Sequence, residues 1–142
     1  MHPQHLFVYG TLRQALGHPM LAWLRQHARF VGPGRVAGVL FDLGRYPGML
    51  CRDGGGWVKG EIWQLLDADA LLARLDAYEG CDAASPRPHE YRRIVASVWL
   101  RGAGRLPAWL YEYALDTTGL PRIADGDYPA HLARRQQRLA TS

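Results

Sequence analysis

The chain has 142 residues, of which 48% are hydrophobic and 21% are charged, as in globular proteins that bury one hydrophobic core. No apolar run is long enough to cross a bilayer, and the N-terminal residues show no charged segment followed by an apolar one, which argues against a signal peptide. We therefore expect a single domain over residues 1–142 that is cytoplasmic and has no membrane partner.

The net charge of +4 raises the question of nucleic-acid binding. The basic residues, nearly all of them arginines, are scattered among acidic ones, and only residues 133–139 form a local basic cluster. A nucleic-acid surface requires a continuous basic patch or a recognisable reading element. We therefore interpret the basic end as the solvated face of a helix and expect no nucleic-acid partner.

The sequence carries no motif for metal-dependent or cofactor-dependent chemistry. Cys51 and Cys81 stand alone, and the six histidines are dispersed without ligand spacing. There is no GxSxG, HExxH or GxGxxG sequence, and the three glycines at 54–56 lack the other residues of a phosphate loop. We expect neither a metal nor a cofactor, and a disulfide between the two cysteines stays open.

The first predicted elements are a strand and an interrupted helix. Residues 5–9 form an apolar run closed by Gly10, which is typical of a buried strand. Residues 12–16 are predicted to begin a helix that Pro19 interrupts. A second helical segment is predicted over residues 19–27, because proline is favoured in the first turn of a helix.

Two further strands are predicted over residues 34–43 and 57–65, where β-branched and aromatic residues are frequent. The connection between them, residues 45–56, is rich in glycine and contains Pro47. Both residue types interrupt regular structure, so this connection is predicted to consist of turns and loop.

Residues 67–80 are the clearest helix of the sequence. Asp67 or Asp69 can cap its start, three leucines form one apolar stripe, and Gly80 can end it. Asp76 is interpreted as a residue of the solvent face of this helix.

The last third of the chain predicts a hairpin and a helix. A polar loop at 81–90 leads to strands at 91–100 and 106–115, joined by a turn, and residues 126–140 resemble a short terminal helix. Many short strands with two or three helices favour an α+β fold with a curled sheet or a small barrel over a doubly wound parallel sheet.

Glu79 is the acidic residue with the least favourable local position. It lies at the end of the predicted helix 67–80, where a negative charge opposes the helix dipole by about 0.3–1 kcal/mol at an exposed site. One interpretation is a solvated side chain, or a pair with Arg92 or Arg93. The other is a carboxyl group whose pKa is raised by burial, so that it can accept and donate a proton near neutral pH.

The junction at residues 6–14, LFVYGTLRQ, passes from an apolar strand through Gly-Thr into a helix-like segment. Successive N–H groups after such a turn can bind a carboxylate or a phosphate. A glycine after an apolar strand is also common in plain chain reversals, so the junction taken alone leaves both interpretations open.

Together these segments resemble the gamma-glutamylcyclotransferase superfamily, and within it the gamma-glutamylamine cyclotransferase-like branch. The matching segments cover nearly the whole chain in order: LFVYGTLR, GVLFDLGRYPG, VKGEIWQL, LDAYEG, YRRIVASV, LYEY and IADGDY. The resemblance implies a barrel-like mixed sheet and an enzyme that cyclises a γ-glutamyl group to 5-oxoproline and releases a free amine. Thr-Leu after YG, where larger relatives carry Ser-Asn, points to the small-protein branch of the superfamily. The chain also lacks the extra motifs of the glutathione-specific relatives, so the resemblance implies a γ-glutamyl amine or peptide as substrate rather than glutathione.

The resemblance also implies which residues form the site. Glu79 is the expected catalytic acid and base, and the expected substrate-binding residues are Phe7, Val8, Tyr9, Gly10, Thr11 and Leu12. Further candidates near the site are Tyr46, Tyr91, Arg92, Tyr111 and Tyr113, for which aromatic strand packing and a surface charge are equally acceptable interpretations. Pro47, next to Tyr46, is expected to help wall the pocket.

Two other functions stay open at this point. One is a non-catalytic module of the same fold that binds a glutamyl group or 5-oxoproline, and the other is nucleic-acid binding through residues 131–142. The expected partner is a small γ-glutamyl molecule. The sequence predicts neither its amine half nor the oligomeric state.

Overall fold

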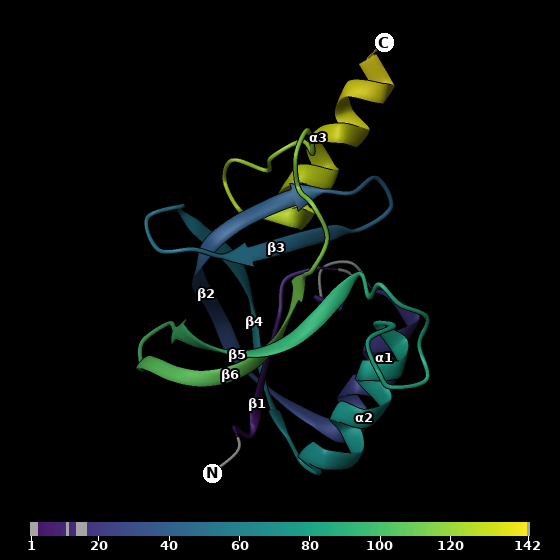
Figure 1. The fold of residues 1–142 in the computed structure, drawn as a ribbon. Helices are drawn as coiled ribbons and strands as arrows, with labels where there is room; N and C mark the ends of the chain where they lie inside the picture. Colours follow the sequence, from purple (N-terminus) through teal and green to yellow (C-terminus); the bar gives the residue numbers. More distant parts are fainter. Residues whose placement is uncertain (1–2, 11, 14–16, 142) are drawn as a thin grey trace.

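Six strands and three helices make up the part of the chain that the computed structural model describes, residues 3–10, 12–13 and 17–141 (Figure 1). The strands are β1 (His5–Val8), β2 (Ala28–Asp42), β3 (Pro47–Cys51), β4 (Trp57–Leu65), β5 (Tyr91–Leu100) and β6 (Gly104–Tyr113). The helices are α1 (Pro19–His27), α2 (Ala68–Tyr78) and α3 (Tyr128–Thr141).

The sheet closes on itself into a small barrel. Its strand order is β3-β2-β4-β1-β6-β5, and β2 also pairs with β5, so that five strands form a ring and β3 extends it outside β2. The β1–β6 pair is parallel and the other pairs are antiparallel. The expected α+β fold with a curled, barrel-like mixed sheet is therefore confirmed.

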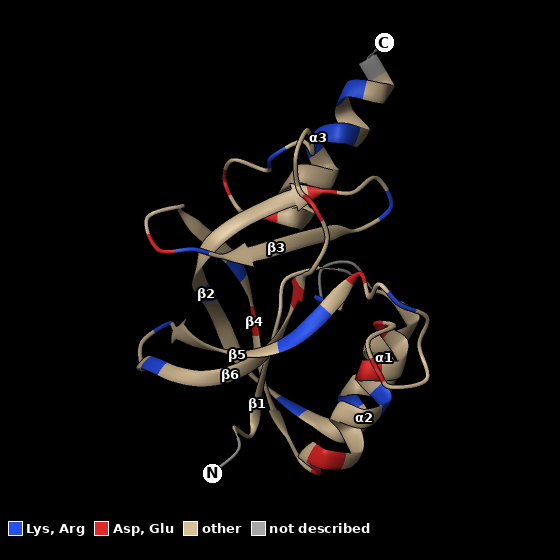
Figure 2. Ribbon diagram, viewed as in Figure 1, with Lys and Arg blue, Asp and Glu red and all other residues tan. Residues whose placement is uncertain are grey.

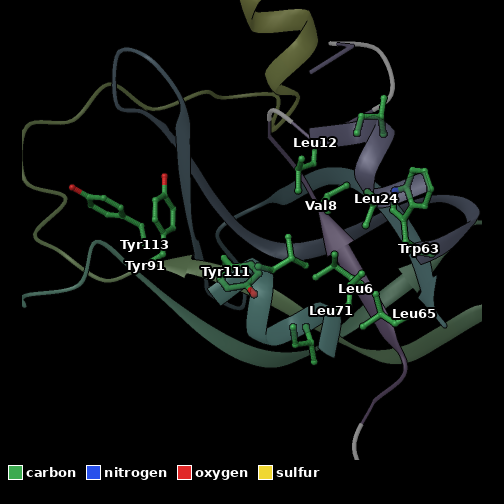
Figure 3. Close-up of a cluster of buried hydrophobic side chains, with 14 residues drawn as sticks. Leu6, Val8, Leu12, Leu24, Trp63, Leu65, Leu71, Tyr91, Tyr111 and Tyr113 are labelled. Carbon is green, nitrogen blue, oxygen red and sulfur yellow. The ribbon is translucent and has the colours of Figure 1, made fainter. Parts of the chain in front are cut away.

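Two hydrophobic cores stabilise this arrangement. The first fills the barrel with residues such as Phe7, Ile62 and Leu110, and Tyr128 of α3 packs against it. The second lies between the outside of the sheet and helices α1 and α2. Figure 3 shows it around β1, where Leu6 and Val8 meet residues that are distant in sequence: Leu24, Trp63, Leu65 and Leu71.

The segment 45–56 corrects one prediction. Residues 47–51 form β3, which pairs antiparallel with β2 from Asp42–Pro47 to Gly38–Cys51. Met49 is fully buried in the barrel core. Pro47 is tolerated because it is the first residue of an edge strand, where the missing N–H removes no interior hydrogen bond of the sheet. Residues 45–46 and 52–56 remain as turn and loop, as predicted.

The other elements largely confirm the predictions, with shifted ends. β2 begins at Ala28, six residues earlier than predicted, and has an irregular register between Phe30 and Gly32. β6 ends at Tyr113 instead of residue 115. Leu12 and Arg13 lie in a turn rather than a helix, and residues 14–16 of that predicted helix are outside the described part of the chain.

Basic and acidic residues are interspersed along the ribbon (Figure 2), and α3 carries Arg134, Arg135 and Arg138. No helix in the described ranges has the length and apolar character required to span a membrane. Cys51 and Cys81 are both free. Among residues 3–10, 12–13 and 17–141, no group of three or more acidic, histidine or cysteine side chains could hold a metal ion.

Candidate functional site

A cavity of about 480 Å³ opens between the end of β1, the end of α2 and the start of β3 and β5. Its walls are built from six separate segments of the chain. The lining residues are Leu6, Phe7, Val8, Tyr9, Gly10, Leu12, His18, Arg45, Tyr46, Pro47, Tyr78, Glu79, Glu90, Tyr91 and Tyr111.

The turn after β1 forms one wall of the cavity. The N–H of Arg13 donates to the carbonyl oxygen of Gly10 at 3.1 Å, which closes the turn. A Cβ atom at Gly10 would lie 2.9 Å from Cγ of Pro47, so a glycine is needed for β3 to approach this closely. Thr11, the remaining predicted binding residue, lies outside the described residues.

Tyr9 connects this turn to β6. Its side chain is buried, and its hydroxyl donates to the carbonyl oxygen of Tyr111 at 2.5 Å. Burial, followed by the charge of Glu79, raises the pKa of the Tyr9 hydroxyl well above its usual value. The phenol therefore stays protonated and holds the turn in place as a hydrogen-bond donor.

Glu79 is placed by the way α2 ends. It is the C-cap residue, and Gly80 follows with a positive φ of 73°. The N–H of Gly80 donates to Ala77 and the N–H of Cys81 donates to Asp76, which is the pattern of a Schellman motif. The glycine predicted to stop the helix thus fixes the backbone from which the Glu79 side chain enters the cavity wall.

The Glu79 carboxyl group has a raised pKa of about 7. Although the residue as a whole is partly exposed, desolvation by the cavity walls is the largest cause, and the charge of Glu90 is the second. Among the described residues, no ion pair or hydrogen bond of the Glu79 side chain offsets these effects. A carboxyl group in this state can both accept and donate a proton near neutral pH.

Asp76, one turn before Glu79, anchors the end of α2 to β5 and β6. Its carboxylate accepts two bonds from Arg93, at 2.8 and 3.2 Å, and one from the Tyr111 hydroxyl at 2.8 Å. Asp76 is therefore not the solvent-face residue that its position in the helix predicted. Because Tyr111 also accepts the bond from Tyr9, this network links the turn after β1 to the helix that carries Glu79.

Three of the further candidates line the cavity. Tyr111 and Tyr91 come from β6 and β5, and Tyr46 comes from the loop before β3. Tyr91 donates its hydroxyl to the carbonyl oxygen of Pro47 at 2.6 Å, and Tyr46 donates to the carboxylate of Glu90. Their aromatic rings and hydroxyl groups thus form one side of the cavity.

The structure places the other two candidates outside this cavity. Arg92 is exposed and pairs with Glu112 at 2.8 Å, and Glu112 also accepts the N–H of Cys51. Tyr113 packs edge-on against Tyr91 with ring centroids 5.8 Å apart, and Figure 3 shows the two rings side by side. The surface-charge interpretation holds for Arg92, and the packing interpretation holds for Tyr113.

Several lining residues were not predicted from the sequence. His18, Arg45, Tyr78 and Glu90 lie in loops or at element ends and were not named as site residues, although Arg45 and Tyr78 fall within the matching segments GVLFDLGRYPG and LDAYEG. Glu90 could have been noticed, because it directly precedes Tyr91, which was a candidate. The place of the other three in the cavity follows from how the strands and helices pack.

Comparisons with known proteins agree with this architecture. The protein shares 32% identity and a TM-score of 0.61 with ytfP of Escherichia coli, over 87% of this chain and 95% of that one. An AIG2-like protein of Mus musculus is 27% identical with a TM-score of 0.69, over 90% of this chain and 89% of that one. A comparison with curated protein sequences finds no match.

YkqA of Bacillus subtilis has a TM-score of 0.70 at 24% identity, over 94% of this chain, and the chain spans 42% of that structure's length. At this identity the likeness shows the fold alone. The family model described as gamma-glutamyl cyclotransferase, AIG2-like, matches residues 6–130, a range that includes the turn after β1, Glu79 and all strand residues except His5. The chain therefore belongs to the AIG2-like gamma-glutamyl cyclotransferase family.

Proposed function

We propose that this protein is a gamma-glutamylcyclotransferase-type enzyme that converts the γ-glutamyl group of an amine or peptide into 5-oxoproline and releases the free amine. The observation that carries the proposal is one cavity in which the Tyr9–Gly10 turn and a Glu79 carboxyl group with a pKa of about 7 lie together. Membership of the AIG2-like family supports it.

The first step in this mechanism is removal of a proton. The α-amino group of the substrate arrives as an ammonium ion, which has no lone pair for attack. Glu79, in its carboxylate form, accepts one proton from it, and the neutral amine then attacks the γ-carbonyl carbon of the same molecule. A new C–N bond closes the five-membered ring.

The second step is departure of the amine. Glu79, now a carboxylic acid, donates its proton to the leaving nitrogen, and the original amide C–N bond breaks. The ring nitrogen still carries one extra proton. The Glu79 carboxylate accepts this proton and then donates it to the released amine. The products are 5-oxoproline and the ammonium form of the amine, and Glu79 is returned to its starting state.

Orientation of the substrate supplies much of the rate in this scheme. Fixing the glutamyl chain in a folded, near-attack geometry can lower the barrier by about 7 kcal/mol or more. The turn at Tyr9, Gly10 and Leu12 is the proposed holder of the amino-acid end, and Phe7, Val8 and Thr11 belong to the same proposed binding segment. The tyrosine side of the cavity would limit access of water.

The test is release of 5-oxoproline from γ-glutamyl amines and from γ-glutamyl-ε-lysine. The wild-type protein should form it, and Glu79→Gln should reduce kcat/KM by about 1,000-fold or more while the protein stays folded, because the amide accepts no proton. Asp69→Asn is the matched control, since Asp69 is an exposed acid in the first turn of the same helix. Wild-type rates in Glu79→Gln would contradict the mechanism.

The pH dependence provides a second test. Because Glu79 must be ionised to accept the proton, kcat/KM should rise with pH through about pH 7 and level off above it. An acid limb near pH 4.5, the ordinary value for a glutamate, would contradict a catalytic base with a raised pKa.

A non-catalytic binding module of the same fold is the competing function. It predicts binding of 5-oxoproline or glutamate by calorimetry, with no turnover of any γ-glutamyl amine or peptide. A raised pKa at Glu79 favours the enzyme, because binding alone requires no group that titrates near pH 7.

A further inference from the structure

Glu90 is a second acidic side chain of the cavity that contains Glu79. It directly precedes β5, and its carbonyl oxygen accepts the N–H of Ala114 at 2.7 Å. The next residue, Tyr91, is buried and bonded to the Pro47 carbonyl at 2.6 Å. These two bonds fix the backbone from which the Glu90 side chain extends.

Tyr46 orients the carboxylate of Glu90. Its hydroxyl oxygen lies 2.7 and 2.9 Å from the two carboxylate oxygens. This hydrogen bond, with burial as the second cause, raises the pKa of Tyr46 to about 12, so the hydroxyl keeps its proton and acts as the donor. A carboxylate has about four lone-pair sites, so Glu90 can accept further hydrogen bonds from a ligand.

Among the residues that the structure describes, the cavity is lined by the carboxyl groups of Glu79 and Glu90 and by one arginine, Arg45, so that carboxyl groups outnumber arginines there. Arg93 pairs with Asp76 and Arg92 pairs with Glu112, outside the cavity. In the described part of the chain, no ion pair within 4.0 Å neutralises Glu79 or Glu90. Two carboxylates in one partly desolvated cavity attract a positively charged group more strongly than either would alone.

We propose that Glu90 binds the α-ammonium group of the γ-glutamyl substrate and holds it beside Glu79. The inference rests on the proposed cyclotransferase function, in which the group that Glu79 deprotonates is an ammonium ion. An ammonium ion offers three N–H donors, enough to bond both carboxylates and one further acceptor. Glu90 thereby becomes a substrate-binding residue with Tyr46 as its positioning residue.

Glu90 also acts on the proton affinity of Glu79, since its negative charge is the second cause of the raised pKa there. Other titratable or charged groups line the same cavity or, in the case of Cys81, interact with the charge of Glu79, and Glu90→Gln leaves all of them unchanged. They are Tyr9, His18, Arg45, Tyr46, Tyr78, Cys81, Tyr91 and Tyr111.

The test compares two ligands that differ only in the α-amino group, γ-glutamyl-n-butylamide and N-butylglutaramic acid. Binding is measured by calorimetry in the Glu79→Gln background, which prevents turnover, with and without Glu90→Gln. The affinity for the ammonium ligand should fall about tenfold, and that for the analogue should stay within twofold, because only the first ligand presents a cation. Asp53→Asn removes an exposed acid elsewhere and should change neither affinity.

A second readout is the titration of Glu79 itself, followed by carboxyl carbon NMR and assigned by its loss in Glu79→Gln. In Glu90→Gln the midpoint should move to lower pH, because a repelling charge has been removed. If Glu90→Gln does not fold, Tyr46→Phe replaces it. This variant should reduce the affinity for the ammonium ligand about threefold.

Equal losses of affinity for both ligands in Glu90→Gln, or no loss for either, would overturn the assignment of Glu90 as the residue that binds the α-ammonium group. The cyclotransferase function fails on a different result, the absence of 5-oxoproline from the wild-type protein. In that case binding is measured in the wild-type background, so the role of Glu90 is decided whether or not the protein turns substrate over.

Discussion

The carboxyl group of Glu79 binds its proton more tightly in the folded protein than in the unfolded chain. Burial and the charge of Glu90 raise its pKa from 4.5 to about 7. Below pH 4.5 the group is protonated in both states, and the shift has no effect on stability. As the pH rises toward 7 the unfolded chain releases the proton first, so the folded protein loses stability, and above pH 7 the full penalty remains.

Glu79→Gln should therefore stabilise the protein at high pH only. At pH 8 its free energy of unfolding should exceed that of the wild type by roughly 1–3 kcal/mol, because the neutral amide avoids the desolvation penalty. At pH 4.5 the two proteins should be nearly equal. Urea unfolding followed by tryptophan fluorescence measures both values, and Asp69→Asn should show no such gain. An equal effect at the two pH values would mean that the Glu79 pKa is not raised.

At the scale of elements, two independent sets of hydrogen bonds hold the end of α2. The Schellman motif at Gly80 fixes the backbone. The hydrogen bonds that Arg93 and Tyr111 donate to Asp76 attach the last turn of the helix to β5 and β6. Arg93 in addition lies over the Trp109 ring, 4.3 Å from its centroid. The position of Glu79 relative to the turn after β1 thus depends on contacts that neither element makes alone.

Asp76→Asn should loosen this attachment without changing side-chain volume. We expect a loss of roughly 1–3 kcal/mol in the free energy of unfolding, since a charge-assisted pair is replaced by weaker bonds. Under the proposed function kcat should fall about tenfold with little change in KM, because Glu79 is misaligned while the binding turn is retained. Steady-state kinetics measures the change in kcat and KM, and urea unfolding measures the change in the free energy of unfolding. Asp69→Asn is the control, and an unchanged kcat in Asp76→Asn would contradict the positioning role.

At the scale of the whole molecule, closure of the barrel depends on two glycines that face each other. Gly34 and Gly60 are paired across β2 and β4, next to the point where β2 also pairs with β5. A Cβ atom at Gly60 would lie 2.4 Å from the carbonyl oxygen of Val8 and 2.5 Å from the Phe7 ring. The missing side chains therefore let β1 and its phenylalanine enter the barrel core.

Gly60→Ala should destabilise the protein by about 2 kcal/mol or more, because the contact includes backbone and a packed ring that cannot yield. Gly32→Ala is a matched control on β2, where the nearest neighbour would be the tip of the Leu100 side chain at 3.2 Å. The free energy of unfolding should fall much less in Gly32→Ala than in Gly60→Ala. Thermal or urea unfolding of the two variants gives the comparison, and similar losses would mean that the close approach at Gly60 is not what limits stability.

The strands predicted from the alternation of apolar and polar residues and from composition are present in the structure, because the pattern that marks them is local. β4 has the predicted bounds, and β5 does as well. β3 was missed because its first two residues, Pro47 and Gly48, are also loop formers. What makes it a strand is the partner, since β2 supplies the hydrogen bonds along its whole length. A local pattern cannot contain that information.

The sequence by itself determined the order of the elements other than β3, a cap by Asp67 or Asp69 at the start of α2 and the stop at Gly80, because each depends on a few neighbouring residues. Only the tertiary structure decided that Glu79 and Glu90 line one cavity, and that Asp76 faces inward to Arg93. The physical reason is that desolvation and charge interaction depend on distance in space. The groups concerned come from segments of the chain that meet only when the barrel closes.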